Sequence, residues 1–425
     1  MTSAPTEILE QIFELAVWKE RSTLRELFKF DFPAANVTRG AIYHTIPRAP
    51  TILASTCRRW RIIALNLPRL WNFLRVPTVE TYRAGNTSRS CIAGRSTFHQ
   101  AIHHVGNAEC EVVLGHTDDW DMLNDHLRCI PRSQISIVNI VSPYHWLDSS
   151  QVPTARVFRL FNKTLLNRDN RAKRFLYYIL PVSALACAKE LECHHALPAV
   201  IAPILSVTSF SLNLLDNAYF PDLCDALANF PNVITLVIRT EWFFHTRLPQ
   251  SFTPLHHACI STLSVTVAII PSLCASLQRG TLSLPSLTHF MLRIDPYYDK
   301  ESWVQLQPLF VNVTRFDIRV ATQQNCGSNI RQLLDLMPLL QQLSVFGVAV
   351  SSALDALLVA PIKQIDKLVI LDSETDGSDV NSYYDSVRSE TVDGAGASGV
   401  ASVLFVNCLH ILPHILQRFS TMDNL

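Results

Sequence analysis

Glycine is scarce in this sequence, with 12 glycines against 23 prolines. Phosphate-binding loops and hairpin-rich barrels both use glycine heavily, so the shortage counts against nucleotide-binding folds. The chain also lacks the G-x-x-x-x-G-K-[ST], G-x-G-x-x-G, G-x-S-x-G and H-E-x-x-H patterns of P-loops, dinucleotide sites, hydrolases and zinc proteases. No spacing of Ser, Cys and His indicates a catalytic triad. We therefore expect neither an enzyme nor a cofactor.

The chain has no excess of either charge, with 36 basic and 36 acidic side chains. Nucleic-acid-binding domains usually carry a basic excess, so no nucleic-acid partner is predicted. One stretch, residues 32–79, has no acid and seven arginines, but it lacks the row of aromatic side chains on which bases stack. Pairing of these arginines with Glu7, Glu10 and Glu14 or with an acidic partner is favoured.

No targeting or membrane segment is predicted. Residues 1–15 contain acids and no basic region followed by a long apolar stretch, so we expect no signal peptide and a cytoplasmic and/or nuclear protein. The eleven cysteines are then interpreted as reduced thiols, mostly buried. The uncharged segment between Arg247 and Arg279 is long enough to span a bilayer, but polar residues and Pro271 interrupt it.

An internal repeat dominates the second half of the chain. An apolar residue is followed three and five positions later by two more, and the first members lie 26, 27, 27, 26, 27 and 25 residues apart. These frames are Val207/Phe210/Leu212, Val233/Leu236/Ile238, Ile260/Leu263/Val265, Leu287/Phe290/Leu292, Val313/Phe316/Ile318, Leu340/Leu343/Val345 and Ile365/Leu368/Ile370. Weaker copies are Ile135/Val138/Ile140, Ala155/Phe158/Leu160, Ala188/Leu191/Cys193 and Val400/Val403/Phe405. A nearly constant period of this length predicts a stacked repeat.

Helical spacings lie between the frames, as in Leu223/Leu227/Phe230, Trp303/Leu306/Leu309/Phe310, Ile330/Leu333/Leu334/Met337 and Leu354/Leu357/Leu358. Each unit is then a short strand and a crossover helix, so the fold class is α/β. The pattern resembles a degenerate leucine-rich repeat, which implies a solenoid with parallel strands on the concave side and helices on the convex side. We expect this domain over residues 79–425, with regular repeats at about 205–371 and an acidic mobile loop at about 372–399. The alternative is an ordinary α/β sheet protein with coincidental spacing.

The N-terminal segment predicts amphipathic helices. One runs from Pro5 to Leu15, with Ile8, Leu9, Ile12, Phe13 and Leu15/Ala16 on a stripe opposite Glu7, Glu10 and Glu14. A second runs from about Thr51 to Asn66, with Leu53, Cys57, Trp60, Ala64 and Leu67 on its apolar stripe. Pro68 ends it, and a short turn with Leu70 and Trp71 follows.

These residues resemble the F-box motif: Pro-x-Glu-Ile-Leu-x-x-Ile-Phe at residues 5–13, Cys-Arg-Arg-Trp-Arg-x-Ile-Ala at 57–64 and Leu-Trp at 70–71. The order is similar to that of F-box-like proteins, abundant in mushroom-forming fungi, that carry irregular leucine-rich repeats. The resemblance implies an F-box-like domain over residues 1–78, with an insertion at about 19–49. It also implies a substrate-recognition adaptor of an SCF-type cullin–RING E3 ubiquitin ligase, which binds a client protein through the repeats and no small-molecule substrate. The Skp1-binding residues that it implies are Pro5, Ile8, Leu9, Ile12, Phe13, Leu53, Cys57, Trp60, Leu70 and Trp71.

The alternative for the same residues is a helical cap on a repeat scaffold with no ligase role. Burial distinguishes the two hypotheses. Docking predicts that Leu9, Ile12 and Leu53 remain partly exposed, whereas capping predicts that they pack on the repeats.

A client surface is predicted beside the core residues of the repeat strands, because side chains alternate between the two faces of a strand. Five basic residues occupy such positions: Arg239, Arg293, Arg315, Arg319 and Lys367. The strands are about 4.8 Å apart, so we expect Arg293, Arg315 and Arg319 to cluster and to bind acidic or phosphorylated client segments. Neutralisation by Asp295 and Asp317 is the alternative.

Two metal-site patterns are weak. Asp372-x-Glu374-x-Asp376-Gly377 matches the start of a calcium loop but has Tyr383 where a bidentate Glu is required. The pairs His103-His104, His194-His195 and His256-His257 suggest zinc, but neighbouring residues on a strand point to opposite faces. We predict no metal.

Overall fold

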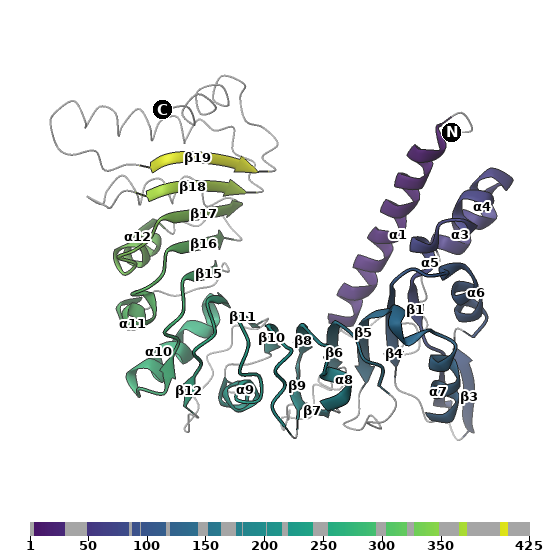
Figure 1. Ribbon diagram of the computed structural model, residues 1–425, viewed down its shortest axis with the longest axis horizontal. Coiled ribbons are helices and arrows are strands. Elements are labelled where there is room, and N and C mark those ends of the chain that lie inside the picture. Colours follow the sequence, from purple (N-terminus) through teal and green to yellow (C-terminus); the bar gives the residue numbers. More distant parts are fainter. Residues whose placement is uncertain are drawn as a thin grey trace. The chain divides into compact units, whose positions relative to one another are not determined.

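The chain divides into two compact units, Met1–Val207 and Thr208–Leu425. The computed structural model (Figure 1) describes residues 4–29, 49–84, 87–93, 95–115, 120–142, 152–162, 176–180, 182–200, 202–214, 220–240, 254–294, 303–320, 327–347, 365–371 and 400–406. Both units are α/β. Their described residues contain eleven α-helices and thirteen strands of parallel sheet, five in the first unit and eight in the second, and neither set closes into a barrel. The predicted domain boundary after residue 78 stays a prediction.

The first unit begins with helices. They are α1 (Thr6–Lys29), α3 (Ala49–Thr56), α4 (Arg58–Leu65) and α5 (Pro68–Trp71), followed later by α6 (Arg95–Val105), α7 (Trp120–Arg128), the 3-10 turn η1 (Arg132–Gln134) and α8 (Val182–Leu185). The expected helix at residues 5–15 is therefore longer than predicted, because it continues through the start of the proposed insertion. The expected helix at residues 51–66 is instead two helices.

Five parallel strands form the sheet of this unit: β1 (Phe73–Arg75), β4 (Cys110–Gly115), β5 (Ile135–Ser142), β6 (Val157–Asn162) and β8 (Glu190–His194). The weaker frames predicted from the sequence lie in β5, β6 and β8, in register: Val138 lies opposite Phe158 and then Leu191. Beside the sheet lie an antiparallel hairpin of β2 (Thr78–Ala84) and β3 (Thr87–Ala93) and a parallel pair of β7 (Leu176–Ile179) and β9 (Ala196–Ala199). The hairpin was not predicted.

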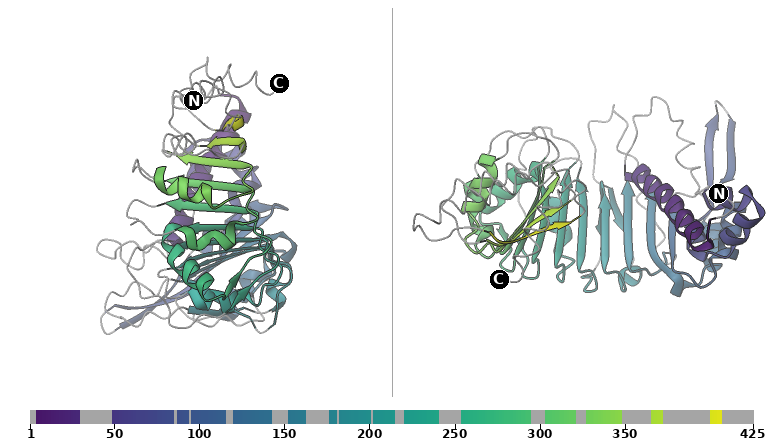
Figure 2. Two further views of the ribbon diagram at one scale, coloured as in Figure 1. Left: turned by 90° about the vertical axis from the view of Figure 1, so that its left-hand side faces the viewer. Right: turned by 90° about the horizontal axis from the view of Figure 1, so that it is seen from above.

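Eight parallel strands form the sheet of the second unit. In spatial order they are β10 (Ser209–Leu214), β11 (Thr235–Thr240), β13 (Thr262–Thr266), β15 (His289–Ile294), β16 (Arg315–Val320), β17 (Gln342–Gly347), β18 (Ile365–Leu371) and β19 (Val400–Val406). Each strand pairs with the next one (Figure 2), as right-handed strand–helix–strand connections favour. A minor pair, β12 (Leu255–His256) and β14 (Leu282–Ser283), lies beside them.

The predicted repeat frames set the register of this sheet. The second members form one row from Phe210 to Leu368 and the third members another from Leu212 to Ile370, each residue opposite its counterpart on the next strand. All fourteen side chains are at most 1% exposed. The prediction of in-register parallel strands from the period is confirmed.

Helices cover the face of the sheet that these rows occupy. They are α9 (Phe220–Leu227), the 3-10 turn η4 (Val267–Ile269), α10 (Ile270–Gln278), the 3-10 turn η5 (Trp303–Leu306), α11 (Gln307–Phe310) and α12 (Gly327–Asp335). Phe230 packs on Phe210 with ring centres 5.4 Å apart, and Phe310 packs on Phe290 at 4.8 Å. Three of the four predicted helical spacings fall mainly on these elements, but Phe230 and Met337 lie just beyond the ends of α9 and α12, and Trp303 and Leu306 lie in a 3-10 turn. The fourth, Leu354/Leu357/Leu358, lies outside the described residues.

The uncharged segment after Arg247 is no single helix. Its described part forms β12, β13, η4 and the nine-residue α10. Across the described residues, no helix is long and apolar enough to cross a membrane. The predicted acidic loop at about 372–399, including the calcium-like sequence, lies outside the described residues.

Candidate functional site

The N-terminal helices have a hydrophobic core of their own. Nine buried residues of α1, α3, α4 and α5 form it: Leu9, Phe13, Val17, Leu53, Ala54, Ile63, Ala64, Leu70 and Trp71. Trp60 packs edge-on against Phe13 with ring centres 4.9 Å apart, and Trp71 donates a hydrogen bond from Nε1 to the Ala64 carbonyl at 2.8 Å. Ala101 of α6 also contacts this core. These helices are therefore a packed element and not a loose arm.

The residues expected to bind Skp1 fall into two groups. Leu9, Phe13, Leu53, Leu70 and Trp71 are buried in the helical core, whereas Pro5, Ile8, Ile12 and Cys57 are exposed and Trp60 is half-buried. The expectation that Leu9 and Leu53 remain partly exposed is wrong, because both fill the space between the helices, while the expectation for Ile12 is confirmed. The capping alternative is also wrong about Leu9 and Leu53, because it predicted that they pack on the repeats, whereas they pack on neighbouring helices.

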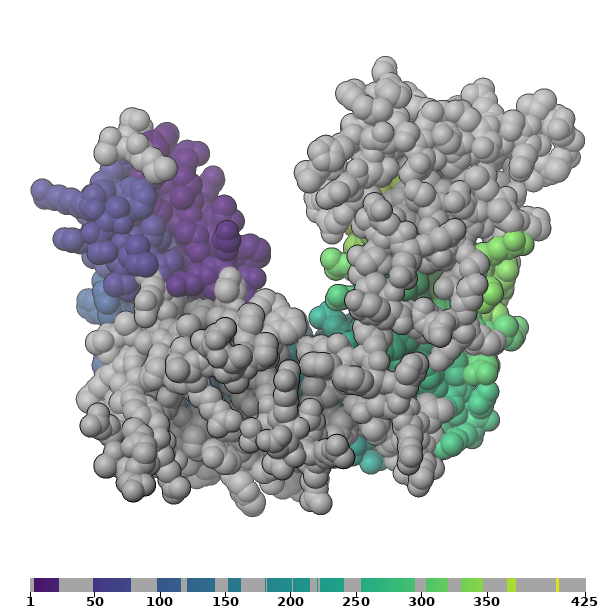
Figure 3. Space-filling view, turned by 180° about the vertical axis from the view of Figure 1, so that it is seen from behind, coloured from purple at the N-terminus to yellow at the C-terminus, as the bar shows by residue number. Residues whose placement is uncertain are grey.

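The apolar stripe predicted along the first helix is split into two. Leu9, Phe13 and Val17 point into the core, whereas Ile8, Ile12, Leu15 and Trp18 are 46%, 47%, 64% and 60% exposed. We call these four residues the apolar face of α1. Ile52 on α3 and Ile62 on α4 are also more than half exposed. In Figure 3 the purple surface of α1 faces the viewer, next to the blue-violet surface of α3 and α4.

Cys57 interrupts the second predicted helix. It has an extended backbone, with φ −156° and ψ 169°, and its Sγ accepts a hydrogen bond from the Trp60 N–H at 3.4 Å as the N-cap of α4. Cys57 is exposed and does not lie on the buried stripe, so that prediction is wrong. The prediction that the cysteines are mostly buried is also wrong for the eight whose burial the structure gives, of which four are buried and four exposed. Burial raises the pKa of Cys110 to about 11, so its thiol stays protonated.

Arginine side chains tie the N-terminal helices to one another and to the residues that follow α5. Arg21, in the unpredicted extension of α1, donates to Asn72 Oδ1 and to the Leu70 carbonyl, both at 2.7 Å, and its guanidinium lies 5.9 Å from the centre of the Phe73 ring. Arg59 and Arg61 donate to the carbonyls of Ala4 and Ala54, and Arg69 lies 3.8 Å from Glu14. The contact between Arg69 and Glu14 is of the predicted arginine–glutamate kind.

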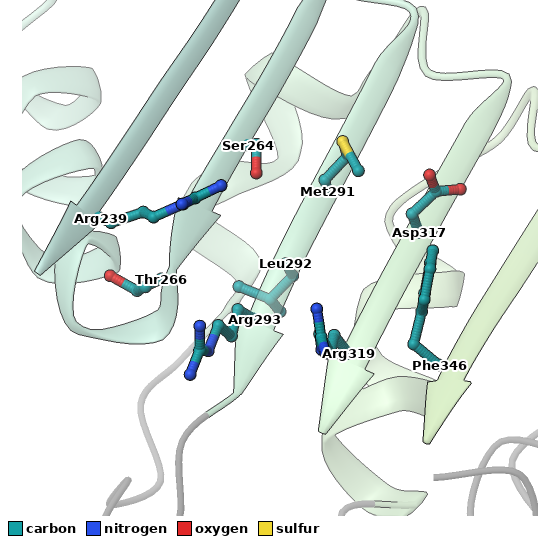
Figure 4. A pocket seen from close by; sticks show the side chains of 9 residues that line it. All are labelled: Arg239, Ser264, Thr266, Met291, Leu292, Arg293, Asp317, Arg319 and Phe346. Atoms are coloured by element: carbon teal, nitrogen blue, oxygen red, sulfur yellow. The ribbon is translucent and has the colours of Figure 1, made fainter. Parts of the chain in front are cut away.

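Three predicted client-binding residues meet on the sheet of the second unit. Arg239, Arg293 and Arg319 lie near the carboxyl ends of β11, β15 and β16, where they line a hollow of about 210 Å³ (Figure 4). Arg293 and Arg319 are direct register partners, and Thr266 separates Arg239 from Arg293. We call this hollow the arginine pocket. Its remaining lining residues are Ser264, Met291, Leu292, Asp317 and Phe346.

Asp317 lies at the edge of the arginine pocket and is only 2% exposed. His289 Nε2 lies 2.9 Å from its Oδ2, and Arg315 donates to it from Nε and Nη2 at 3.0 and 3.1 Å. Burial alone raises the pKa of this carboxyl, but hydrogen bonds from His289, Arg315 and Ser344 outweigh burial and hold the pKa below its ordinary value. Asp317 is therefore a carboxylate whose charge is already balanced.

The predicted cluster of Arg293, Arg315 and Arg319 is confirmed for two of its members. Arg315 instead binds Asp317, as the neutralisation alternative predicted, and does not line the pocket. Lys367 lies on β18 opposite Gln342 and also lies outside the pocket. Asp295, the other predicted neutralising acid, lies outside the described residues.

A charged network on the sheet of the first unit was missed by the sequence analysis. Arg159 donates to Glu111 at 3.2 Å and to Glu192 at 3.0 Å, Asn139 donates to Glu111 at 2.9 Å, and His194 Nε2 lies 2.8 Å from Glu192. The side chain of Glu111 is 8% exposed and that of Arg159 is 19% exposed. The sequence does contain a sign of this network. A charged residue stands between the two core residues of a frame, as Arg159 does between Phe158 and Leu160.

The histidine pairs do not assemble a metal site. His103 and His104 lie at the end of helix α6, where the argument from strand geometry does not apply, and His257 Nε2 bonds to the Phe230 carbonyl at 2.9 Å. Within the described ranges, no group of three or more His, Cys, Asp and Glu side chains is arranged to hold a metal ion.

Comparison with protein-family models and with curated proteins gives no match to this chain.

Proposed function

We propose that this chain is a substrate-recognition adaptor of an SCF-type cullin–RING E3 ubiquitin ligase. In this proposal the N-terminal helices act as an F-box-like domain that binds Skp1, and the repeats of the second unit act as a leucine-rich-repeat solenoid that holds a client protein. The chain itself catalyses no reaction and works in the cytoplasm or nucleus. The observation that supports the proposal best is the apolar face of α1.

Large apolar side chains are rarely left in a continuous exposed stripe unless a partner covers them. Ile8, Ile12 and Leu15 follow one another at spacings of four and three, so they lie on one side of the helix. An amphipathic helix face of this kind is suited to helix-in-groove or helix-on-helix binding. The core behind it keeps the face in place, because Leu9 and Phe13 fix the rotation of α1.

The burial of Leu9 decides which variant tests Skp1 binding. Leu9 is 1% exposed, so its replacement by Asp disrupts the helical core and loses binding through unfolding. Ile8 and Ile12 are about half exposed, so the Ile8→Asp/Ile12→Asp variant removes the apolar face and leaves the core intact. Ile234→Asp, at an isoleucine of the second unit that is 47% exposed, is the matched control.

The test is the affinity of the full chain for purified Skp1 from the same organism, measured by calorimetry. We expect binding by the parent and by Ile234→Asp, and binding at least about tenfold weaker for Ile8→Asp/Ile12→Asp, as for the loss of an interface hot spot. Circular dichroism checks that all three proteins are folded. A folded parent that does not bind Skp1 contradicts the proposal and leaves a repeat scaffold with no ligase role.

A further inference from the structure

We infer that the exposed face of the second unit's sheet presents a client to activated ubiquitin without accepting ubiquitin itself, because its cationic positions carry arginine in place of lysine. The inference rests on the proposed function and adds a property of the surface that this function assigns to the client. It concerns which amino groups of the assembled ligase are modified, and not how the client is recognised.

Lysine is rare in this chain, and rarest in the repeats. Of the 36 basic side chains, 28 are arginines and eight are lysines, although lysine is among the commonest residues of globular proteins. Residues 190–362 contain seven arginines and a single lysine, Lys300, which lies outside the described residues. Strands β10 to β17 therefore contain no lysine, and the first lysine on the sheet is the half-buried Lys367 of β18.

The two basic side chains differ in their reactivity with ubiquitin. A client is modified when a neutral lysine amine attacks the thioester that joins the carboxyl end of ubiquitin to a conjugating enzyme. The nitrogen–carbon bond of an isopeptide forms, the carbon–sulfur bond breaks, and the released thiolate takes up the proton that the amine loses. Arginine keeps its proton in proteins and cannot attack in this way. Arginine in place of lysine thus retains the positive charge and removes the acceptor.

The contacts of the exposed arginines separate a structural reason for arginine from this chemical one. Arg315 donates to Asp317 from Nε at 3.0 Å and from Nη2 at 3.1 Å, a two-pronged contact that a lysine amine cannot make. Arg239 and Arg319 are exposed, and within the part of the chain that the structure describes neither has a hydrogen bond or an ion pair. The fold does not require a guanidinium at these two positions, so lysine would supply the same charge there.

Proximity makes an acceptor on this face costly to a ligase. A client bound to the sheet is held where activated ubiquitin reaches it, so a lysine on the same face shares the high effective concentration of the donor. Ubiquitin joined to that lysine would also cover the surface on which the client lies. A face whose exposed cations are arginines avoids both effects.

The experiment measures self-modification of the full chain in a ligase reconstituted from purified Skp1, cullin–RING core, conjugating enzyme and ubiquitin, and it needs no client. The variant Arg239→Lys/Arg319→Lys adds two amines to the exposed face and keeps its charge. The first control, Arg239→Gln/Arg319→Gln, changes the same positions without adding an amine. The second control, Arg128→Lys/Arg156→Lys, adds two amines to the first unit, where these arginine side chains are 77% and 62% exposed.

We expect at least about tenfold more ubiquitin on Arg239→Lys/Arg319→Lys than on the parent or either control, and mass spectrometry should map the added ubiquitin to residues 239 and 319. A parent that is modified as heavily as this variant, a variant that gains no ubiquitin, or an equal gain from the amines added to the first unit overturns the inference.

Skp1 affinity, measured by calorimetry on the same samples, separates this inference from the proposed function. A folded parent that does not bind Skp1 contradicts the proposed function and the inference with it. Skp1 binding by a parent that is itself heavily modified contradicts the inference alone.

Discussion

The two units use the same strand position differently. In each parallel strand, one residue directly follows the third member of the apolar frame. In the first unit that residue is Val141, Phe161 or His194, each at most 3% exposed. In the second unit the residue varies: Arg239, Arg293 and Arg319 are exposed and Phe346 is half-buried, whereas Asn213 and Thr266 are buried. The rows of buried core residues next to these positions are alike in the two units, so the core residues do not determine whether this face of a sheet is covered or open. The residue that follows the third member of the frame determines it.

The position between the second and third members of the frame is used in the same way in both units, because charge there is balanced by a neighbouring side chain. Arg159 and Glu192 hold each other in the first unit, and Asp317 is held by Arg315 and His289 in the second. These positions are closer to the middle of the sheet and are poorly hydrated, so an uncompensated charge is costly there. Ligand-directed charge is therefore found at the strand ends.

The largest expected effect on stability comes from removing a buried side chain at the position that follows the third member of the frame. Phe161→Ala is expected to lower the free energy of unfolding by about 4 kcal/mol, because Phe161 is fully buried and its ring stacks on His194. Phe346→Ala, at the equivalent position of β17, removes a half-buried ring and should cost about 1 kcal/mol. Urea unfolding measures both changes, and equal losses would remove the distinction between a covered and an open face.

A smaller effect is expected from breaking the charged network. Arg159→Met removes a cation that is bound to both Glu111 and Glu192 in a largely buried position, and should lower the free energy of unfolding by about 3 kcal/mol. Arg156→Met is the control, since Arg156 is 62% exposed and reaches Glu109 only at 4.0 Å, and it should change stability by about 0.5 kcal/mol. If Arg159→Met behaves like the control in urea unfolding, the network is not a stabilising element.

The Asp317 ion pairs should contribute about 2 kcal/mol, and this contribution depends on pH. The folded-state pKa of Asp317 lies below its unfolded value of about 3.9, so the stabilisation is complete above that value and is lost as pH falls through the folded pKa. Asp317→Asn should therefore be less stable than the parent at about pH 6, with a smaller difference at about pH 3.

Asp335→Asn, at the exposed end of α12, is the control for this measurement and should change stability by less than about 0.5 kcal/mol at either pH. Chemical unfolding at the two pH values measures the difference. A destabilisation by Asp317→Asn that is the same at both would show that the ionised form of Asp317 has no special role.

The sequence predicted the repeat strands well because their signal is periodic. Each frame places apolar residues on one face, and the nearly constant interval marks the matching positions of successive strands, so Phe290 and Phe316 were assigned to the same row without a structure. The helical boundaries were less predictable. The continuation of α1 to Lys29 depends on contacts made more than 40 residues away, such as Arg21 with Asn72, which no local pattern records. The break at Cys57 depends on a thiol used as a helix cap.

The candidate surfaces were predicted in part for the same reason. Alternation along a strand placed Arg293 and Arg319 on one face, and the register did bring them together. It did not show that Arg315 turns to Asp317, two residues along its own strand, because that choice depends on the buried position of Asp317 and on His289. For α1, helical spacing identified the apolar residues but not which side faces the core, since the stripe is wider than the contact with α3 and α4.

The in-register ladder also determines how such a chain can change in length during evolution. Loss of one residue within a strand moves the side chains on one side of the deletion to the opposite face. The connections tolerate single-residue changes, because intervals of 25 to 27 residues all leave the core rows in register. Loss of a whole repeat, from Thr262 to Thr288, instead places β15 directly beside β11 with both core rows continuous, because β13 pairs with each of them in the same register. That deletion also brings Arg239 next to Arg293. Gain or loss of complete repeats thus rearranges the exposed arginines while the buried core is retained, so recognition can diversify faster than the fold that carries it.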